Sequence, residues 1–321
     1  MEPYRAPWWL PGAHVQTAVA PLFALRQHVD YDRRERWTAP DGDFIDVDWA
    51  GPESAPRLLV LFHGLEGSSS SHYARAIGAR ALSMGGWRFA LPHFRGCSGE
   101  LNRRARAYHA ADSAEIDWVL RSFAERHPAV YAAGVSLGAN ALLKWLCSPD
   151  HEAHRVVRRA AAVSSQLDMV AFGNTIGCGF NRVYGWFFIY LTPLRRKALL
   201  KMALFPDEHA ALGVSERRVR AATTLPAFDS ALTAPLHGFR DELDYWTQGS
   251  TVRLLSNIRV PTLLLNARND PFLPESVLPE PGDVPGQLTL DFPQHGGHAG
   301  FPGRNQWMAR RVFEFLADPG S

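Results

Sequence analysis

Short, almost wholly apolar runs alternate with helical patterns along most of the chain. Continuously apolar segments of this kind are typical of parallel strands that helices cover on both faces. Repeated strand–helix alternation predicts right-handed crossovers and a mostly parallel sheet. We expect strands at residues 58–62, 87–91, 130–135, 160–163, 260–266 and 287–292, with helices at 73–84, 116–123 and 305–316.

Two segments depart from this alternation. Residues 44–49 alternate apolar and polar positions, which predicts a half-exposed strand near an edge of the sheet. Residues 165–257 are rich in aromatic residues and arginines and contain helical stretches but no convincing strand. We therefore expect an α/β core formed by residues 1–164 and 258–321, with a tryptophan-rich arm at 1–40. Residues 165–257 would be a helical lid inserted between two core strands.

Composition narrows the class of protein. The chain has 321 residues, 46% of them hydrophobic, and a formal net charge of +2, which gives no case for a nucleic-acid partner. Three widely separated cysteines form neither a disulfide framework nor a metal-binding pair, and this fits a reducing compartment. The first residues do not resemble a signal peptide, and no apolar run is long enough to span a membrane. A cytoplasmic location is therefore expected.

The strand at 130–135 runs directly into the pentapeptide Gly-Val-Ser-Leu-Gly at residues 134–138, and a helix begins at once after it. A chain that reverses this sharply holds its central residue in a strained conformation with the side chain at the tip. Glycine is required on either side, where a Cβ would collide with the neighbouring strand and helix. Ser136 is therefore the candidate nucleophile.

The last two strands each deliver a candidate partner for Ser136 at their carboxyl ends, where open parallel sheets place active sites. Asp270 follows the strand at 260–266, and His298 follows the strand at 287–292. A serine hydroxyl needs a base within reach, and imidazole can take its proton and later return it. A carboxylate on the far ring nitrogen would orient the imidazole. The order Ser, Asp, His is that of the α/β-hydrolases.

Other residues compete for these roles. His295 is the alternative base, although it is better suited to ordering its loop, and Asp168 is the alternative acid. A metal site of Asp291, His295 and His298 is disfavoured, because Asp291 should point into the sheet layer. Neither a metal nor a cofactor is expected. We expect the remaining carboxylates of the insertion to be solvated or salt-bridged: Asp229, Asp241 and Asp244.

An oxyanion hole needs two backbone N–H groups aimed at the tetrahedral oxygen. Leu137, directly after the nucleophile, provides one of them. The second is expected from Leu65, in the loop that follows the strand at 58–62. His63 in this loop is expected to brace it, with substrate contact as the alternative.

Residues 183–191 are apolar or aromatic and are flanked by basic residues. They predict either a buried lid helix, with Trp186 and Phe187 lining an acyl pocket, or a helix that contacts membrane lipid. In the first case the lid roofs the acyl site. In the second case the basic residues meet lipid headgroups.

Residues 7–17 form a loop rich in proline and glycine that carries Trp8 and Trp9. We interpret this segment as an arm that attaches to the core by burying its large aromatic side chains. A direct role for His14 or Gln16 is the alternative.

Taken together, these motifs resemble the YheT-like branch of the α/β-hydrolases, cytoplasmic bacterial esterases related to the eukaryotic ABHD lipases. The matching stretches are residues 8–17, 63–68, 72–75, 94–100, 107–109, 134–140, 270–272 and 295–301. The resemblance implies an α/β-hydrolase fold and a catalytic triad of Ser136, Asp270 and His298. Ala139 is a departure, because relatives often carry a third glycine there.

The resemblance also implies cleavage of carboxylic esters, with monoacylglycerol or short- to medium-chain acyl esters as substrates. Such a serine esterase would work through an acyl-enzyme. An acyltransferase with the same triad and a membrane-associated, phospholipase-like lipid hydrolase are the alternatives. A binding protein with an inactive triad is disfavoured, because all three members are present. Neither the oligomeric state nor membrane contact through the lid follows from the sequence.

Overall fold

The computed structural model describes residues 2–24 and 27–318. These residues form one eight-stranded sheet with the spatial order β1-β2-β4-β3-β5-β6-β7-β8. The strands from β4 to β8 in this order are parallel, and β1 and β2 are antiparallel additions at one edge. The strands are β1 (Arg33–Thr38), β2 (Phe44–Ala50), β3 (Arg57–Phe62), β4 (Trp87–Pro92), β5 (Val130–Val135), β6 (Ala160–Val163), β7 (Thr262–Leu265) and β8 (Leu288–Asp291).

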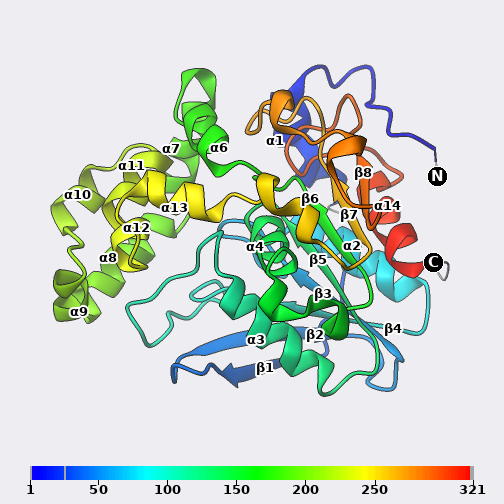
Figure 1. Cartoon of the computed structure of the whole chain (residues 1–321), viewed down its shortest axis with the longest axis horizontal. Helices are drawn as coiled ribbons and strands as arrows, with labels where there is room; N and C mark the ends of the chain where they lie inside the picture. Colours follow the sequence, from blue (N-terminus) through cyan, green and yellow to red (C-terminus); the bar gives the residue numbers. More distant parts are fainter. Residues whose placement is uncertain (1, 25–26, 319–321) are drawn as a thin grey trace.

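Helices cover both faces of this sheet (Figure 1). The predicted α/β-hydrolase fold, with a mostly parallel sheet between helical layers, is confirmed. The helices of the core are α1 (Ala13–Phe23), α2 (His72–Ser83), α3 (Ser113–Ala124), α4 (Leu137–Leu146), α5 (Ala153–Val156) and α14 (Trp307–Ala317), with short 3-10 turns η1 (Pro149–His151), η5 (Glu275–Val277) and η6 (Pro281–Asp283).

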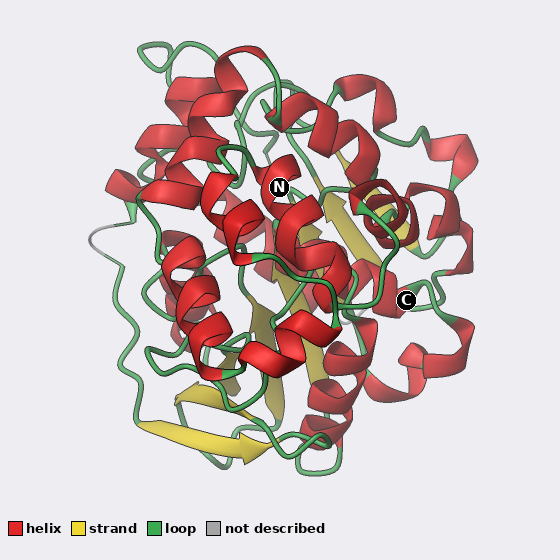
Figure 2. Cartoon of the chain, turned by 90° about the vertical axis from the view of Figure 1, so that its left-hand side faces the viewer, coloured by secondary structure: helices red, strands yellow, loops and turns green. Residues whose placement is uncertain are grey.

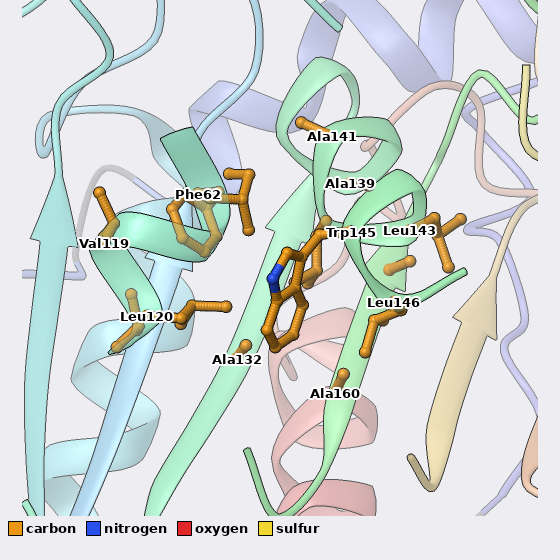
Figure 3. Packing of buried hydrophobic residues seen from close by; sticks show 14 of the residues in the cluster. Phe62, Val119, Leu120, Ala132, Ala139, Ala141, Leu143, Trp145, Leu146 and Ala160 are labelled. Atoms are coloured by element: carbon orange, nitrogen blue, oxygen red, sulfur yellow. The ribbon is translucent and has the colours of Figure 1, made fainter. Parts of the chain in front are cut away.

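Two apolar clusters lie on opposite faces of the sheet because successive strand residues point to opposite sides. On β3, Leu58 and Val60 join the cluster under α3 and α4, whereas Leu59 and Leu61 join the cluster under α2 and α14. Figure 3 shows Trp145 of α4 in the first cluster, among side chains of α3 and of the neighbouring strands. The wide burial of α4 holds the helix that follows Ser136 firmly on the sheet.

The expectation of a half-exposed strand at residues 44–49 is wrong. Strand β2 is buried along its whole length, because β1 pairs with it and forms the outer edge. The pairing places Arg34 opposite Asp48, and the Arg34 Nε donates to Asp48 Oδ1 at 2.6 Å. Strand β1 escaped prediction because most of its residues are charged and only Trp37 is buried.

Residues 169–257, which we call the helical insertion, lie between β6 and β7 and project to one side of the sheet (Figure 1). In Figure 2, which views the molecule from that side, the insertion stands in front of the strands. Its elements are α6 (Met169–Ile176), η2 (Gly179–Asn181), α7 (Arg182–Tyr190), α8 (Leu194–Leu204), α9 (Pro206–Ala211), α10 (Glu216–Ala221), α11 (Leu225–Phe228), η3 (Asp229–Thr233), α12 (Ala234–Leu236), α13 (Glu242–Gly249) and η4 (Val252–Asn257).

The N-terminal arm does not attach through its tryptophans, and that expectation is wrong. Trp8 is 92% exposed and Trp9 is more than half exposed. Part of the expected loop is instead the helix α1, which buries Gln16 and packs against the loop that carries His298. Hydrogen bonds of the Gln16 and Thr17 side chains, rather than burial of the two tryptophans, hold α1 against that loop.

Candidate active site

Ser136 stands at the junction of β5 and α4 with φ 55° and ψ −119°, a conformation that is rare for a residue with a side chain. The flanking glycines allow this junction. A Cβ on Gly134 would lie 2.6 Å from the carbonyl oxygen of Gly138 and 2.7 Å from the Cα of Ala139. These are backbone atoms that cannot move aside, so the strand and helix can approach this closely only with glycine at residue 134.

The structure brings the three predicted residues together in one hydrogen-bonded chain. His298 Nε2 lies 2.8 Å from Ser136 Oγ, and His298 Nδ1 lies 2.8 Å from Asp270 Oδ2. The second oxygen of Asp270 accepts a hydrogen bond from the N–H of Phe272 at 2.9 Å. The carboxylate is therefore buried and fully engaged, and one imidazole nitrogen faces it while the other faces the serine.

The loop after β3 lies directly against Ser136. A Cβ on Gly64 would be only 3.2 Å from the Cβ of Ser136. The N–H groups on either side of Leu65 are occupied, since Gly64 donates to Tyr73 Oη and Glu66 donates to Tyr108 Oη, both at 2.8 Å. Within the described part of the chain, no hydrogen bond uses the N–H of Leu65 or of Leu137. Two free donors therefore remain near the serine.

His63 braces this loop. Its side chain is completely buried, with Nδ1 donating to the carbonyl of Gly64 at 2.8 Å and Nε2 accepting from the N–H of Phe94 at 3.0 Å. Burial lowers the pKa of His63 to about 3, so the imidazole is neutral. The alternative of direct substrate contact is wrong for His63, because no surface of the ring is accessible.

The rival catalytic residues take no part in this hydrogen-bonded chain. Asp168 caps α6 by accepting a hydrogen bond from the N–H of Ala171, and His295 is exposed. Asp291 pairs with Arg311 Nε at 2.6 Å. In residues 2–24 and 27–318, no cluster of three or more His, Cys, Asp or Glu side chains could hold a metal ion.

The helix α1 is attached to the two loops that carry Asp270 and His298. Gln16 Oε1 accepts hydrogen bonds from the N–H of Gly296 at 2.9 Å and from Asn269 Nδ2 at 3.0 Å. Thr17 Oγ1 accepts from the N–H of His298 at 2.9 Å. Gln16 is buried and orders these loops rather than taking the direct role that was the alternative, and Thr17 was missed. The only sequence signal for Thr17 is its place in the stretch 8–17 that carries the family resemblance.

A cavity of about 110 Å³ lies between the core and the helical insertion. Leu65 and Leu137 line it on the core side, and apolar side chains of the helical insertion line it on the other, namely Met169, Phe172, Leu225, Phe228, Leu232 and Leu236. Trp186 and Phe187 do not line this cavity, and both are nearly half exposed on the outer face of α7. Their predicted place in the acyl pocket is wrong, because α7 turns Gly185 and Ile189 inward instead.

Asp229 also lines this cavity, within the π-helical turn η3. Its oxygens accept hydrogen bonds from Trp246 Nε1 at 3.0 Å and from Thr233 Oγ1 at 2.7 Å. Burial raises the pKa of Asp229 to about 6, although these hydrogen bonds oppose the change. The expectation of a solvated or salt-bridged carboxylate is therefore wrong for Asp229. Asp241 and Asp244 are exposed or half-exposed and accept hydrogen bonds at the start of α13.

Comparisons with known proteins define the class. A family model described as alpha/beta hydrolase fold matches residues 57–303. Two solved structures share the fold: an esterase from Exiguobacterium antarcticum (15% identity, TM-score 0.56, covering 89% of this chain and all of that one) and an esterase of Pyrococcus furiosus (13% identity, TM-score 0.55, covering 90% and 92%). The protein is thus an α/β-hydrolase.

Two relatives narrow the assignment further. The protein named "Putative esterase YheT" of Escherichia coli (strain K12) is 35% identical over 94% of this chain and 89% of its own length. The phospholipase ABHD3 of Mus musculus is 27% identical over 94% of this chain and 73% of its own length. The chain belongs to the α/β-hydrolase fold family, in its YheT-like branch. None of the helices described here is long and apolar enough to cross a membrane.

Proposed function

We propose that Ser136, His298 and Asp270 cleave a carboxylic ester in two steps. Ser136 Oγ attacks the carbonyl carbon while His298 Nε2 takes its proton, and the imidazolium then returns that proton to the departing alcohol. Water attacks the resulting acyl-enzyme by the same route, which releases the acid and restores the serine. Asp270 holds the imidazole and stabilises its charged form.

The observation that carries this proposal is the unbroken chain of hydrogen bonds from Ser136 through His298 to Asp270, with 2.8 Å at each link. The unpaired N–H groups of Leu65 and Leu137 support it, because together they could stabilise the developing oxyanion. Membership of the YheT-like branch makes the protein a carboxylic ester hydrolase.

The cavity beside Leu65 and Leu137 supports a short acyl group. A cavity of about 150 Å³ is large enough to hold benzene, so a volume of about 110 Å³ suits an acyl chain of only a few carbons. The mostly apolar lining favours a hydrocarbon chain over a polar group. We propose short-chain esters as substrates, with the alcohol leaving toward solvent.

Labelling with a fluorophosphonate probe tests the nucleophile. The wild type should be labelled, Ser136→Ala should not, and Ser83→Ala, at an exposed position on α2, should be labelled like the wild type. Full labelling of Ser136→Ala would refute the assignment.

A series of p-nitrophenyl esters with increasing acyl length tests the pocket. We expect kcat/KM to fall once the acyl chain exceeds a few carbons, and a steady rise with chain length would contradict the assignment of this cavity. Adding an alcohol acceptor separates hydrolysis from transfer, because a transferase would form the new ester at the expense of free acid.

A further inference from the structure

The outward face of α7 is apolar. Its exposed side chains fall at the spacing of a single helix face and range from 37% to 63% exposed; they are Val183, Trp186, Phe187, Tyr190 and Leu191, which we call the apolar stripe. A surface helix of a globular protein normally turns its polar face to solvent. Here the helix buries Gly185 and Ile189 and presents large apolar groups outward. A contiguous exposed patch of this kind marks an interaction surface.

The segment that carries the apolar stripe has charges of one sign. Residues 169–206 contain no aspartate or glutamate but five basic residues: Arg182, Arg195, Arg196, Lys197 and Lys201. Lys201 is buried and Lys197 points into the core, while Arg182 and Arg196 are exposed. Arg195 lies over the ring of Tyr190, 4.1 Å from its centroid. The exposed charge that this segment contributes next to the stripe is therefore positive and suits a negatively charged partner.

We propose that the apolar stripe docks this enzyme on the surface of a lipid bilayer that contains anionic lipids. Tryptophan and tyrosine side chains are enriched at the level of lipid headgroups, and Trp186 and Tyr190 stand side by side with ring centroids 5.5 Å apart. A helix with an apolar face and basic residues at its margin lies in that interface. The arginines would meet the acidic headgroups while the stripe enters the acyl boundary.

The inner face of α7 connects this surface to the active site. Tyr184 packs on Phe272 with ring centroids 4.7 Å apart, and Phe272 packs on His298 with ring centroids 4.4 Å apart. Tyr184 Oη also hydrogen-bonds to His14 of the arm at 3.1 Å. The helix therefore lies close over the imidazole, and docking would place the site next to the bilayer. Docking does not rest on the proposed function, because it requires no catalysis.

Sedimentation with vesicles tests this proposal. We expect the full-length protein to sediment with vesicles of phosphatidylglycerol and phosphatidylcholine in equal amounts, and far less with phosphatidylcholine alone. The double variant Trp186→Ser/Phe187→Ser should partition at least about tenfold more weakly. Reversing the charge of both Arg182 and Arg196 to glutamate should also weaken partitioning by at least about tenfold. Added salt should weaken the wild type in the same direction.

Matched controls separate docking from other effects. Met84→Ser changes an exposed apolar residue at the C-terminal end of α2, and Arg310→Glu changes an exposed basic residue on α14. Both variants should sediment like the wild type. Ser136→Ala should also sediment fully, so failure of the nucleophile assignment leaves this result unaffected. Equal sedimentation of the wild type and the Trp186→Ser/Phe187→Ser variant would overturn the proposal. The proposal would also fail if the wild type were a dimer in solution and Trp186→Ser/Phe187→Ser were a monomer, because a second copy of the chain would then cover the stripe.

Discussion

Thr17 offers a test of how the arm positions the imidazole without touching substrate. Its Oγ1 donates to the carbonyl of Ala13 at 2.8 Å and accepts from the N–H of His298 at 2.9 Å. Thr17→Val replaces the hydroxyl by a methyl group of similar shape. The change therefore removes the acceptor for His298 and leaves the packing of α1 almost intact.

The size of the effect follows from that missing acceptor. A buried N–H without a partner costs about 1–3 kcal/mol, and the loop can recover part of this cost only by moving. Its freedom is small, because a Cβ on Gly297 would already lie 2.8 Å from the carbonyl oxygen of Ala13. A displacement of about 1 Å at a catalytic group can reduce the rate by about 10²-fold. We therefore expect kcat to fall roughly 10- to 100-fold, with KM little changed because Thr17 does not line the cavity.

Steady-state hydrolysis of p-nitrophenyl acetate, well below the unfolding temperature, measures kcat and KM separately. Urea unfolding should show a loss of about 1–2 kcal/mol for Thr17→Val. Thr17→Ser keeps the hydroxyl and should restore most of kcat. If Thr17→Val kept the wild-type kcat, or if Thr17→Ser lost as much as Thr17→Val, the hydrogen bond to His298 would not be what positions the imidazole.

Three further predictions concern single interactions. Lys197 Nζ lies 2.7 Å from Oε1 of the buried Glu66 side chain, the residue after Leu65. Lys197→Met should therefore lower the free energy of unfolding by about 3 kcal/mol and reduce kcat. The double variant Lys197→Met/Glu66→Gln should recover this stability in urea unfolding. Asp229 is harder to ionise in the folded protein than in the unfolded chain, so the wild type should lose up to about 3 kcal/mol of stability as the pH rises from about 4 to about 7. Asp229→Asn should lack this loss, and parallel pH profiles of the two proteins would contradict the raised pKa. Gly134→Ala should destabilise by more than about 3 kcal/mol, because its Cβ would meet backbone atoms; Gly282→Ala, with open space around it, should melt like the wild type.

The sequence by itself determined the core of the sheet and the residues that meet at its carboxyl edge. Continuous apolar runs identify buried parallel strands, since such strands are covered on both faces and need no polar side. Ser136 follows one of these strands directly, and Asp270 and His298 lie in the loops that follow two others. Parallel strands end at the same edge, so local patterns were enough to predict that the three side chains would come together.

Only the tertiary structure decided which way the ambiguous faces point. The spacing of apolar residues in α7 is the same whether that face meets the core or solvent, and only packing shows that Trp186 and Phe187 face outward. A sequence does not show the partners of its charged residues, so each one is expected to face solvent. The pairing of Arg34 with Asp48 and the burial of Asp229 were therefore not predicted. Thr17 contacts His298 across 281 residues of sequence, and no local pattern reports a hydrogen bond between segments so far apart.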